Sequence, residues 1–282
     1  MKILLLTGDT VDIDKGISSR DMLVSGLYYW LSKKEYEILI YNVNPLMNGL
    51  QSLESFLNEL PGCDVLLVRL YTDSWVVQNI KKIKERLNCK TVSFIEHKQH
   101  NMDLTVAFLK STNPDVYIPF PYVEKYMVSN EKDKGTILLD GQIEGMTEGC
   151  VLGLVTKWLK PLAKTYKIFQ LGGKPLADYV ELIPNSNYKS YMESTSRMEF
   201  FIQTHSGSYE HSIIDMVGRG IKTLMYPSLI PDEMVKDLEL PTYKNQEELI
   251  DLIKTVKVED KLNKMTPMEK VVGLLGERFE KL

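Results

Sequence analysis

The most informative part of the sequence runs from Phe200 to Ile221 and reads FFIQTHSGSYEHSIIDMVGRGI. A hydrophobic run ends at Gln203, a loop of small residues follows, and the periodic segment 208–219 predicts an amphipathic helix. Gly220 fits a left-handed helix end before the next hydrophobic run, 221–226. A strand, a helix and a second strand in this order indicate a βαβ unit of a parallel sheet.

The same alternation of short hydrophobic runs and amphipathic segments extends along the whole chain. The predicted strands are 2–7, 36–41, 65–70, 91–95, 116–119, 136–139, 166–171, 179–183, 200–203 and 221–226. The predicted helices of the second half are about 148–164, 188–196, 208–219, 246–255 and 267–281. Nearly continuous hydrophobic strands separated by helices are typical of parallel sheets covered on both faces. The expected fold class is therefore α/β.

A polar break at residues 131–135 separates two similar α/β halves. The expected domains are 1–130 and 131–282, with the last helix as a candidate to pack back on the first domain. A chain of 282 residues is long enough for two cores. We expect two Rossmann-like domains that face a cleft, because such sheets bind ligands at the carboxyl ends of their strands.

Composition excludes several classes of protein. There are 34 basic and 38 acidic residues, spread so that both halves are close to neutral, which disfavours nonspecific nucleic-acid binding. Three scattered cysteines without a C-x-x-C pair argue against a disulfide framework or structural zinc, and favour a reducing compartment. The first apolar run is too short for a signal peptide, and no stretch is long enough to span a membrane. We therefore expect a cytoplasmic protein; its oligomeric state is not predicted.

The loop and helix start within 203–210 are suited to bind a phosphate. Backbone N–H groups at a helix start lack intrahelical partners and carry the positive end of the helix dipole. Two acids, Glu210 and Asp215, accompany this feature. Either they contact a ligand from the helix, or Glu210 is an ordinary first-turn acid and Asp215 a solvated surface acid.

From Tyr179 to Pro227 the sequence resembles the donor-binding half of GT-B-fold glycosyltransferases that use nucleotide sugars. The resemblance rests on Glu210 after the small-residue loop, on Asp215 five residues before Gly220, and on the upstream pair Ile183-Pro184. It implies that Asp215 binds the ribose hydroxyls, that Glu210 contacts the transferred sugar or its phosphates, and that the 183–184 loop holds the base. It also implies a nucleotide-diphosphate sugar, UDP-sugar in particular, as co-substrate.

The resemblance also implies that no metal is needed at this site, since the helix dipole and basic side chains neutralise the leaving diphosphate in such enzymes. The four histidines show no metal-ligand spacing. The loop after Leu139 lacks the Arg and Lys that usually hold the diphosphate, and Lys174 is the expected substitute; the alternative is an ordinary turn lysine. The candidate donor-binding residues are Gly16, Gln142, Lys174, Ile183, Pro184, His205, Ser206, Gly207, Ser208, Tyr209, His211, Ser212 and Asp215.

Three residues are candidate catalytic groups: Glu210, Glu96 and His97. The last two follow the predicted strand 91–95 and therefore lie at the carboxyl end of the first sheet. Either one can take a proton from an attacking hydroxyl if its surroundings tune its pKa. The alternative is a polar turn at a strand end without a chemical role.

The sequence thus predicts a glycosyltransferase that moves a sugar from a nucleotide-diphosphate sugar to an acceptor hydroxyl. The acceptor stays open among a glycan, a metabolite, a protein and a modified DNA base. Two alternatives remain: a sugar-nucleotide epimerase of the same fold, and a non-catalytic binding or assembly subunit. The missing Arg and Lys after Leu139 favour the last alternative.

Overall fold

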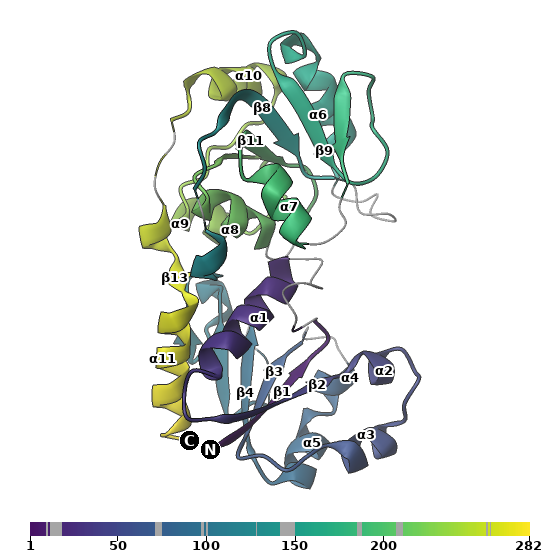
Figure 1. The fold of residues 1–282 in the computed structure, drawn as a ribbon, viewed down its shortest axis with the longest axis vertical. Coiled ribbons are helices and arrows are strands. Elements are labelled where there is room, and N and C mark those ends of the chain that lie inside the picture. Colours follow the sequence, from purple (N-terminus) through teal and green to yellow (C-terminus); the bar gives the residue numbers. More distant parts are fainter. Residues whose placement is uncertain are drawn as a thin grey trace. The chain divides into compact units, whose positions relative to one another are not determined.

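The chain forms two compact units in a computed structural model (Figure 1). The structure describes residues 1–282 except 10, 12–18, 71–74, 97, 98, 100, 128, 142–149, 185–187, 207–210, 258 and 260. Several predicted site residues lie outside the described residues: Gly16, His97, Gln142, Gly207, Ser208, Tyr209 and Glu210.

Unit 1 holds Met1–Gly16 and Arg20–Val123 together with the tail Thr266–Leu282. Its main sheet has the order β2-β1-β3-β4-β5-β6, and all neighbouring strands are parallel. The strands of unit 1 are β1 Lys2–Thr7, β2 Glu37–Asn42, β3 Val65–Arg69, β4 Lys90–Ile95, β5 Leu104–Ala107, β6 Val116–Tyr117, β7 Pro121–Tyr122 and β13 Thr266–Pro267. Its helices are α1 Ser19–Leu31, α2 Asn44–Met47, α3 Leu53–Glu59, α4 Trp75–Gln78, α5 Ile80–Leu87, α11 Met268–Phe279 and the 3-10 turn η1 Lys110–Thr112.

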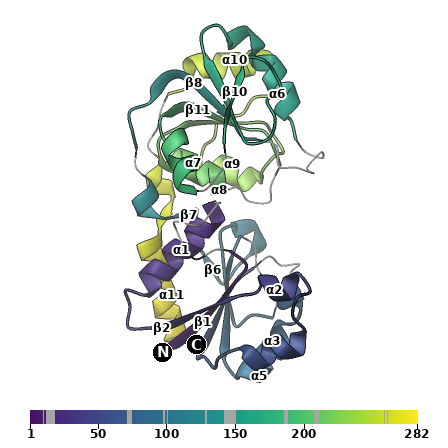
Figure 2. The same cartoon turned by 45° about the vertical axis from the view of Figure 1, so that its right-hand side comes forward.

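Helices cover both faces of the unit 1 sheet. Residues 3–6 of β1 are completely buried, as expected for a central parallel strand. Phe56 of α3 and Ile83 of α5 pack with Leu66 of β3 on one face. The connection from β1 to β2 runs in the opposite direction to that from β3 to β4, so right-handed crossovers place α1 on the other face (Figure 2).

Unit 2 comprises Glu124–Met265 and holds a second parallel sheet of order β10-β9-β8-β11-β12. Its strands are β8 Asp133–Leu139, β9 Lys167–Leu171, β10 Val180–Ile183, β11 Met198–Gln203 and β12 Lys222–Met225. Its helices are α6 Leu152–Leu159, α7 Tyr188–Thr195, α8 His211–Gly218, α9 Asp232–Asp237 and α10 Gln246–Thr255, with the 3-10 turns η2 Glu124–Tyr126, η3 Lys160–Leu162 and η4 Leu262–Lys264.

The core of unit 2 fixes which helices face which side of its sheet. Val155 of α6 and Leu249 of α10 pack on Ile137 and Phe200 of the sheet. Because β8 leads to β9 on one side and β11 leads to β12 on the other, right-handed crossovers place α6 and α8 on opposite faces (Figure 1). Gly220 ends the α8 region with a φ of 70°, which confirms the predicted left-handed helix end.

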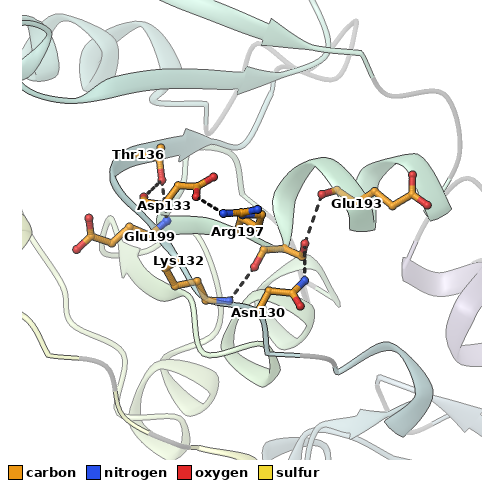
Figure 3. A network of polar contacts seen from close by, with 8 residues as sticks. Asn130, Lys132, Asp133, Thr136, Glu193, Arg197 and Glu199 are labelled. Atoms are coloured by element: carbon orange, nitrogen blue, oxygen red, sulfur yellow. Dashed lines mark hydrogen bonds and ion pairs between the residues drawn. The ribbon is translucent and has the colours of Figure 1, made fainter.

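A network of hydrogen bonds and ion pairs lies at the amino end of the unit 2 sheet (Figure 3). Arg197 Nη2 lies 2.8 Å from Asp133 Oδ1, and Lys132 Nζ donates to the carbonyl oxygen of Ser196 at 2.8 Å. Burial lowers the pKa of Lys132, and the charge of Arg219 lowers it further. The polar groups at this end of the sheet are therefore paired with one another.

Two elements and one boundary differ from those expected from the sequence. The first sheet has six strands and not five, because the short strand Leu104–Ala107 was missed. The helix Asp232–Asp237 was missed as well. The chain passes from unit 1 to unit 2 after Val123, earlier than the expected 130, and α11 belongs to unit 1. No helix among the described residues is both long enough and apolar enough to cross a membrane.

Candidate functional site

The five parallel strands of unit 2 end at one edge of their sheet, which we call the carboxyl edge. It consists of the residues that directly follow the strands: 140–141, 172–174, 184, 204–206 and 226. Open parallel sheets bind ligands at this edge, because loops and helix starts meet there. The predicted donor-binding residues His205, Ser206, Lys174 and Pro184 are all part of it.

An acid and a histidine meet at the centre of the carboxyl edge. Asp140 follows β8, and His205 lies just beyond the end of the neighbouring strand β11. Oδ2 of Asp140 lies 3.2 Å from Nδ1 of His205, and both residues are buried. Thr204 Oγ1 donates to the carbonyl oxygen of Asp140, which links the two loops. The carboxylate and the imidazole are therefore within ion-pair distance of each other when the ring is protonated.

Two fully buried glutamines lie beside this pair, and the sequence analysis missed both. Gln203 Nε2 donates to the carbonyl oxygen of His205 at 3.1 Å. Gln170 Nε2 donates to the carbonyl oxygens of Gly172 and Lys174 at 2.9 and 3.0 Å. Among the described residues, neither Gln Oε1 atom has a hydrogen-bond partner. Buried polar atoms are nearly always hydrogen-bonded, so these oxygens are candidate ligand contacts.

At Gly141 the backbone after β8 lies very close to the backbone at the end of β9. A Cβ atom at this position would lie 1.3 Å from the carbonyl oxygen of Leu171, at the end of the neighbouring strand β9. No side chain can occupy that space, so the close approach of the two segments requires glycine. The glycine thereby determines the shape of the edge between β8 and β9.

Asp215 lies on α8 and is buried, with 6% of its surface exposed. Tyr188 donates its hydroxyl to Asp215 Oδ2 at 2.9 Å, and Arg219 Nη2 lies 3.8 Å from the same oxygen. Arg219 also donates to Thr195 Oγ1 at 3.1 Å. Burial raises the pKa of Tyr188 well above its usual value, and the charge of Asp215 raises it further. The carboxylate therefore joins α7 to α8, and the reading of Asp215 as a solvated surface acid is wrong.

The remaining described candidates differ in exposure. His211 is buried at the first position of α8, and the Oγ atom of Ser212 has no hydrogen-bond partner among the described residues. Ile183 is buried at the end of β10, and Pro184 beside it is exposed. Lys174 is exposed as well, and its backbone carbonyl is engaged by Gln170.

Glu96 lies in unit 1, directly after β4, and forms a buried ion pair with Arg69 at the end of β3. Arg69 Nη2 donates to Glu96 Oε1 at 2.9 Å and Nη1 donates to Oε2 at 3.3 Å. Both side chains are almost completely buried. Arg69 was missed by the sequence analysis, although a charge at the end of the hydrophobic run 65–68 is a signal for it. Within the described ranges, no three His, Cys, Asp or Glu side chains gather in a way that could hold a metal ion.

Replacing Tyr188 with phenylalanine is expected to lower the free energy of unfolding by about 1.5–3 kcal/mol, because the buried Asp215 loses a hydrogen-bond donor. Tyr191→Phe on the same helix is the matched control. Its hydroxyl is buried without a hydrogen-bond partner among the described residues, so its removal is expected to cost close to nothing. Urea unfolding measures both, and equal losses would contradict the role given to Tyr188.

The similarity to several solved structures extends over nearly the whole chain. A mutant O-GlcNAc transferase from Thermobaculum terrenum is 11% identical, with a TM-score of 0.64 over 100% of this chain and 67% of that one. The chain has the GT-B fold. UDP-GlcNAc 2-epimerase from Neisseria meningitidis, bound to UDP-GlcNAc, is 13% identical, with a TM-score of 0.62 over 100% of both chains. A spinosyn forosaminyltransferase is 9% identical, with a TM-score of 0.62 over 99% of both. No protein-family model and no curated protein matches the sequence.

Proposed function

We propose that the chain is a glycosyltransferase that binds a nucleotide-diphosphate sugar, UDP-sugar in particular, at the carboxyl edge of unit 2. The observation that carries this proposal is the group of buried polar side chains at that edge, in a chain with the GT-B fold. Solved structures of this fold include glycosyltransferases that match this chain over nearly its full length. The acceptor class stays open among glycans, metabolites, proteins and modified DNA bases.

The edge offers the chemistry that a sugar nucleotide needs. The amide oxygens of Gln170 and Gln203 accept hydrogen bonds from sugar or base groups. The backbone N–H groups at the start of α8 face the diphosphate, and Ser212 Oγ lies in that first turn. Asp215 binds the ribose hydroxyls through its carboxylate, whose orientation Tyr188 and Arg219 fix. Lys174 neutralises part of the diphosphate charge.

Transfer requires a base for the acceptor hydroxyl. The acceptor oxygen forms a bond to the anomeric carbon, the bond from that carbon to the diphosphate oxygen breaks, and the hydroxyl proton passes to the base. Both carboxylate oxygens of Glu96 accept hydrogen bonds from Arg69. Such charge-assisted hydrogen bonds favour the ionised form of Glu96, which suits a positioning role. We therefore assign the base to His97 and keep Glu210 as the predicted contact to the sugar. Metal independence is part of the proposal and predicts full activity in EDTA.

Replacing Asp215 with asparagine is expected to weaken UDP binding about 10- to 100-fold, because a charged hydrogen-bond acceptor contributes about 1.5–3 kcal/mol. Asp133→Asn is the matched control, since Asp133 lies at the opposite end of the same sheet and pairs with the exposed Arg197. Isothermal titration calorimetry with UDP measures both variants. Unchanged binding in Asp215→Asn, or an equal loss in Asp133→Asn, would contradict the assignment.

A sugar-nucleotide epimerase is the second candidate, favoured by the full-length likeness to UDP-GlcNAc 2-epimerase. The two functions differ in whether a sugar nucleotide reacts without an acceptor. Incubation with UDP-GlcNAc alone, followed by NMR, shows a new sugar nucleotide only for an epimerase. Release of UDP that depends on an added acceptor supports the transferase. Failure to bind any nucleotide diphosphate would support a non-catalytic subunit.

A further inference from the structure

Two cysteines lie at the amino end of the unit 1 sheet, away from the strand ends discussed above. Cys63 comes two residues before β3 begins, and Cys89 directly precedes β4. These two strands are neighbours in the sheet, with Val65 paired to Lys90. Lys90 N donates to the carbonyl oxygen of Asp64 at 3.0 Å, and these two residues directly follow Cys89 and Cys63 in the sequence. Residues far apart in the sequence are thereby brought side by side.

The two thiols also face the same core. Cys89 is buried in the cluster formed by α3, α5 and the sheet, and the half-buried Cys63 packs against that cluster. The register places Cys63 one residue out of line with Cys89. Neighbouring strands lie about 4.8 Å apart and each residue advances about 3.3 Å along a strand, so such a pair is about 5.8 Å apart. That separation falls within the range of about 4.4–6.8 Å between Cα atoms in disulfides. The backbone therefore holds the pair at a separation that a disulfide can bridge.

The two thiols influence each other's protonation. The neighbouring Cys63 thiol lowers the pKa of Cys89, and the charge of Lys84 lowers it further, while burial and the charge of Asp103 act in the opposite sense. The neighbouring Cys89 sulfur and burial raise the pKa of Cys63. Thiolate character therefore concentrates on Cys89, which is the form of sulfur that attacks a disulfide.

We propose that Cys63 and Cys89 form a reversible intramolecular disulfide by exchange with a soluble disulfide such as oxidised glutathione. One protein thiolate attacks a glutathione sulfur, and the first glutathione leaves as its thiolate. The second protein thiol loses its proton to water and attacks the protein sulfur of the mixed disulfide, and the second glutathione leaves. The two cysteines are oxidised by two electrons, and one oxidised glutathione is reduced to two thiols.

The test is mass spectrometry of the intact chain after incubation with mixtures of reduced and oxidised glutathione. Oxidation is expected to remove two protein thiols together, lower the mass by two hydrogens, and give a peptide pair linked through Cys63 and Cys89. Dithiothreitol is expected to restore both thiols. Cys150, in unit 2, serves as the internal reference, and Cys150→Ser is expected to behave like the wild type.

The single-cysteine variants distinguish a pair that forms an intramolecular disulfide from two cysteines that react separately with glutathione. Cys63→Ser and Cys89→Ser are each expected to lose the linked peptide and, at most, to carry one glutathione on the remaining cysteine of the pair, besides any on Cys150. The proposal is overturned if the wild type collects separate glutathione adducts at both cysteines without a link, or if both thiols stay reduced at high oxidised glutathione. These wild-type results decide the question even if Cys89→Ser fails to fold.

Discussion

Replacing Arg69 with methionine is expected to lower the free energy of unfolding by about 3–5 kcal/mol, because it leaves the buried carboxylate of Glu96 without its counter-charge. The guanidinium donates to both carboxylate oxygens, and 1% and 4% of the two side chains are exposed. A charge in such a site cannot be stabilised by water. Urea unfolding followed by circular dichroism measures the loss.

Two further variants show whether the buried charge is the cause. Adding Glu96→Leu to Arg69→Met is expected to recover most of the stability, since both charges are then gone. Arg197→Met is the matched control, because Arg197 pairs with Asp133 while 61% and 52% of their side chains are exposed. That control is expected to cost at most about 1 kcal/mol. Similar losses for Arg69→Met and Arg197→Met would refute this account of the pair.

Replacing Gly141 with alanine is expected to cost more than about 4 kcal/mol, because the new methyl group would overlap the carbonyl oxygen of Leu171 at 1.3 Å. The Leu171 atoms nearest to the new methyl group are backbone atoms and not the end of a flexible side chain, so strands β8 and β9 must separate. The carboxyl edge deforms with them, and nucleotide binding is expected to be lost even where the variant folds. Thermal unfolding and UDP calorimetry measure the two effects.

Gly273 in α11 provides the matched control for the Gly141→Ala substitution. Among the described residues, a Cβ atom there would meet no atom within 4 Å apart from those of its own stretch of helix, and the residue lies within a regular helix. Gly273→Ala is therefore expected to leave stability unchanged or to raise it by about 0.5–1 kcal/mol. If Gly141→Ala behaved like Gly273→Ala, the close approach at the carboxyl edge would be disproved.

The fold class could be predicted from the sequence because the patterns that indicate it are local. Hydrophobic runs such as 2–7 and 167–171 alternate with amphipathic helices, and that alternation is sufficient to predict parallel sheets. The strand Leu104–Ala107 was not predicted because it is four residues long and follows a short polar segment. Its burial comes from the neighbouring strands β4 and β6, which no local pattern reveals.

The site was predictable only in part, for the same reason. The stretch around His205 and Asp215 carries its own pattern of loop and helix start. Gln170 and Gln203 look like ordinary polar residues within hydrophobic strands, and only the sheet order brings both to one edge. The Arg69–Glu96 pair likewise joins two neighbouring strands through residues that are 27 positions apart in the chain. Polar groups that meet across strands are determined by tertiary structure.

The most direct test of the nucleotide site is NMR mapping of backbone amides during titration with UDP. We predict that the shifted signals include Asp140, Gly141, His205, Ser206 and Ser212, at the carboxyl edge and the start of α8. Signals of Lys132 and Asp133, at the amino end of the same sheet, are predicted to stay in place. Shifts confined to unit 1 or to that amino end, or no shift at millimolar UDP, would contradict the account.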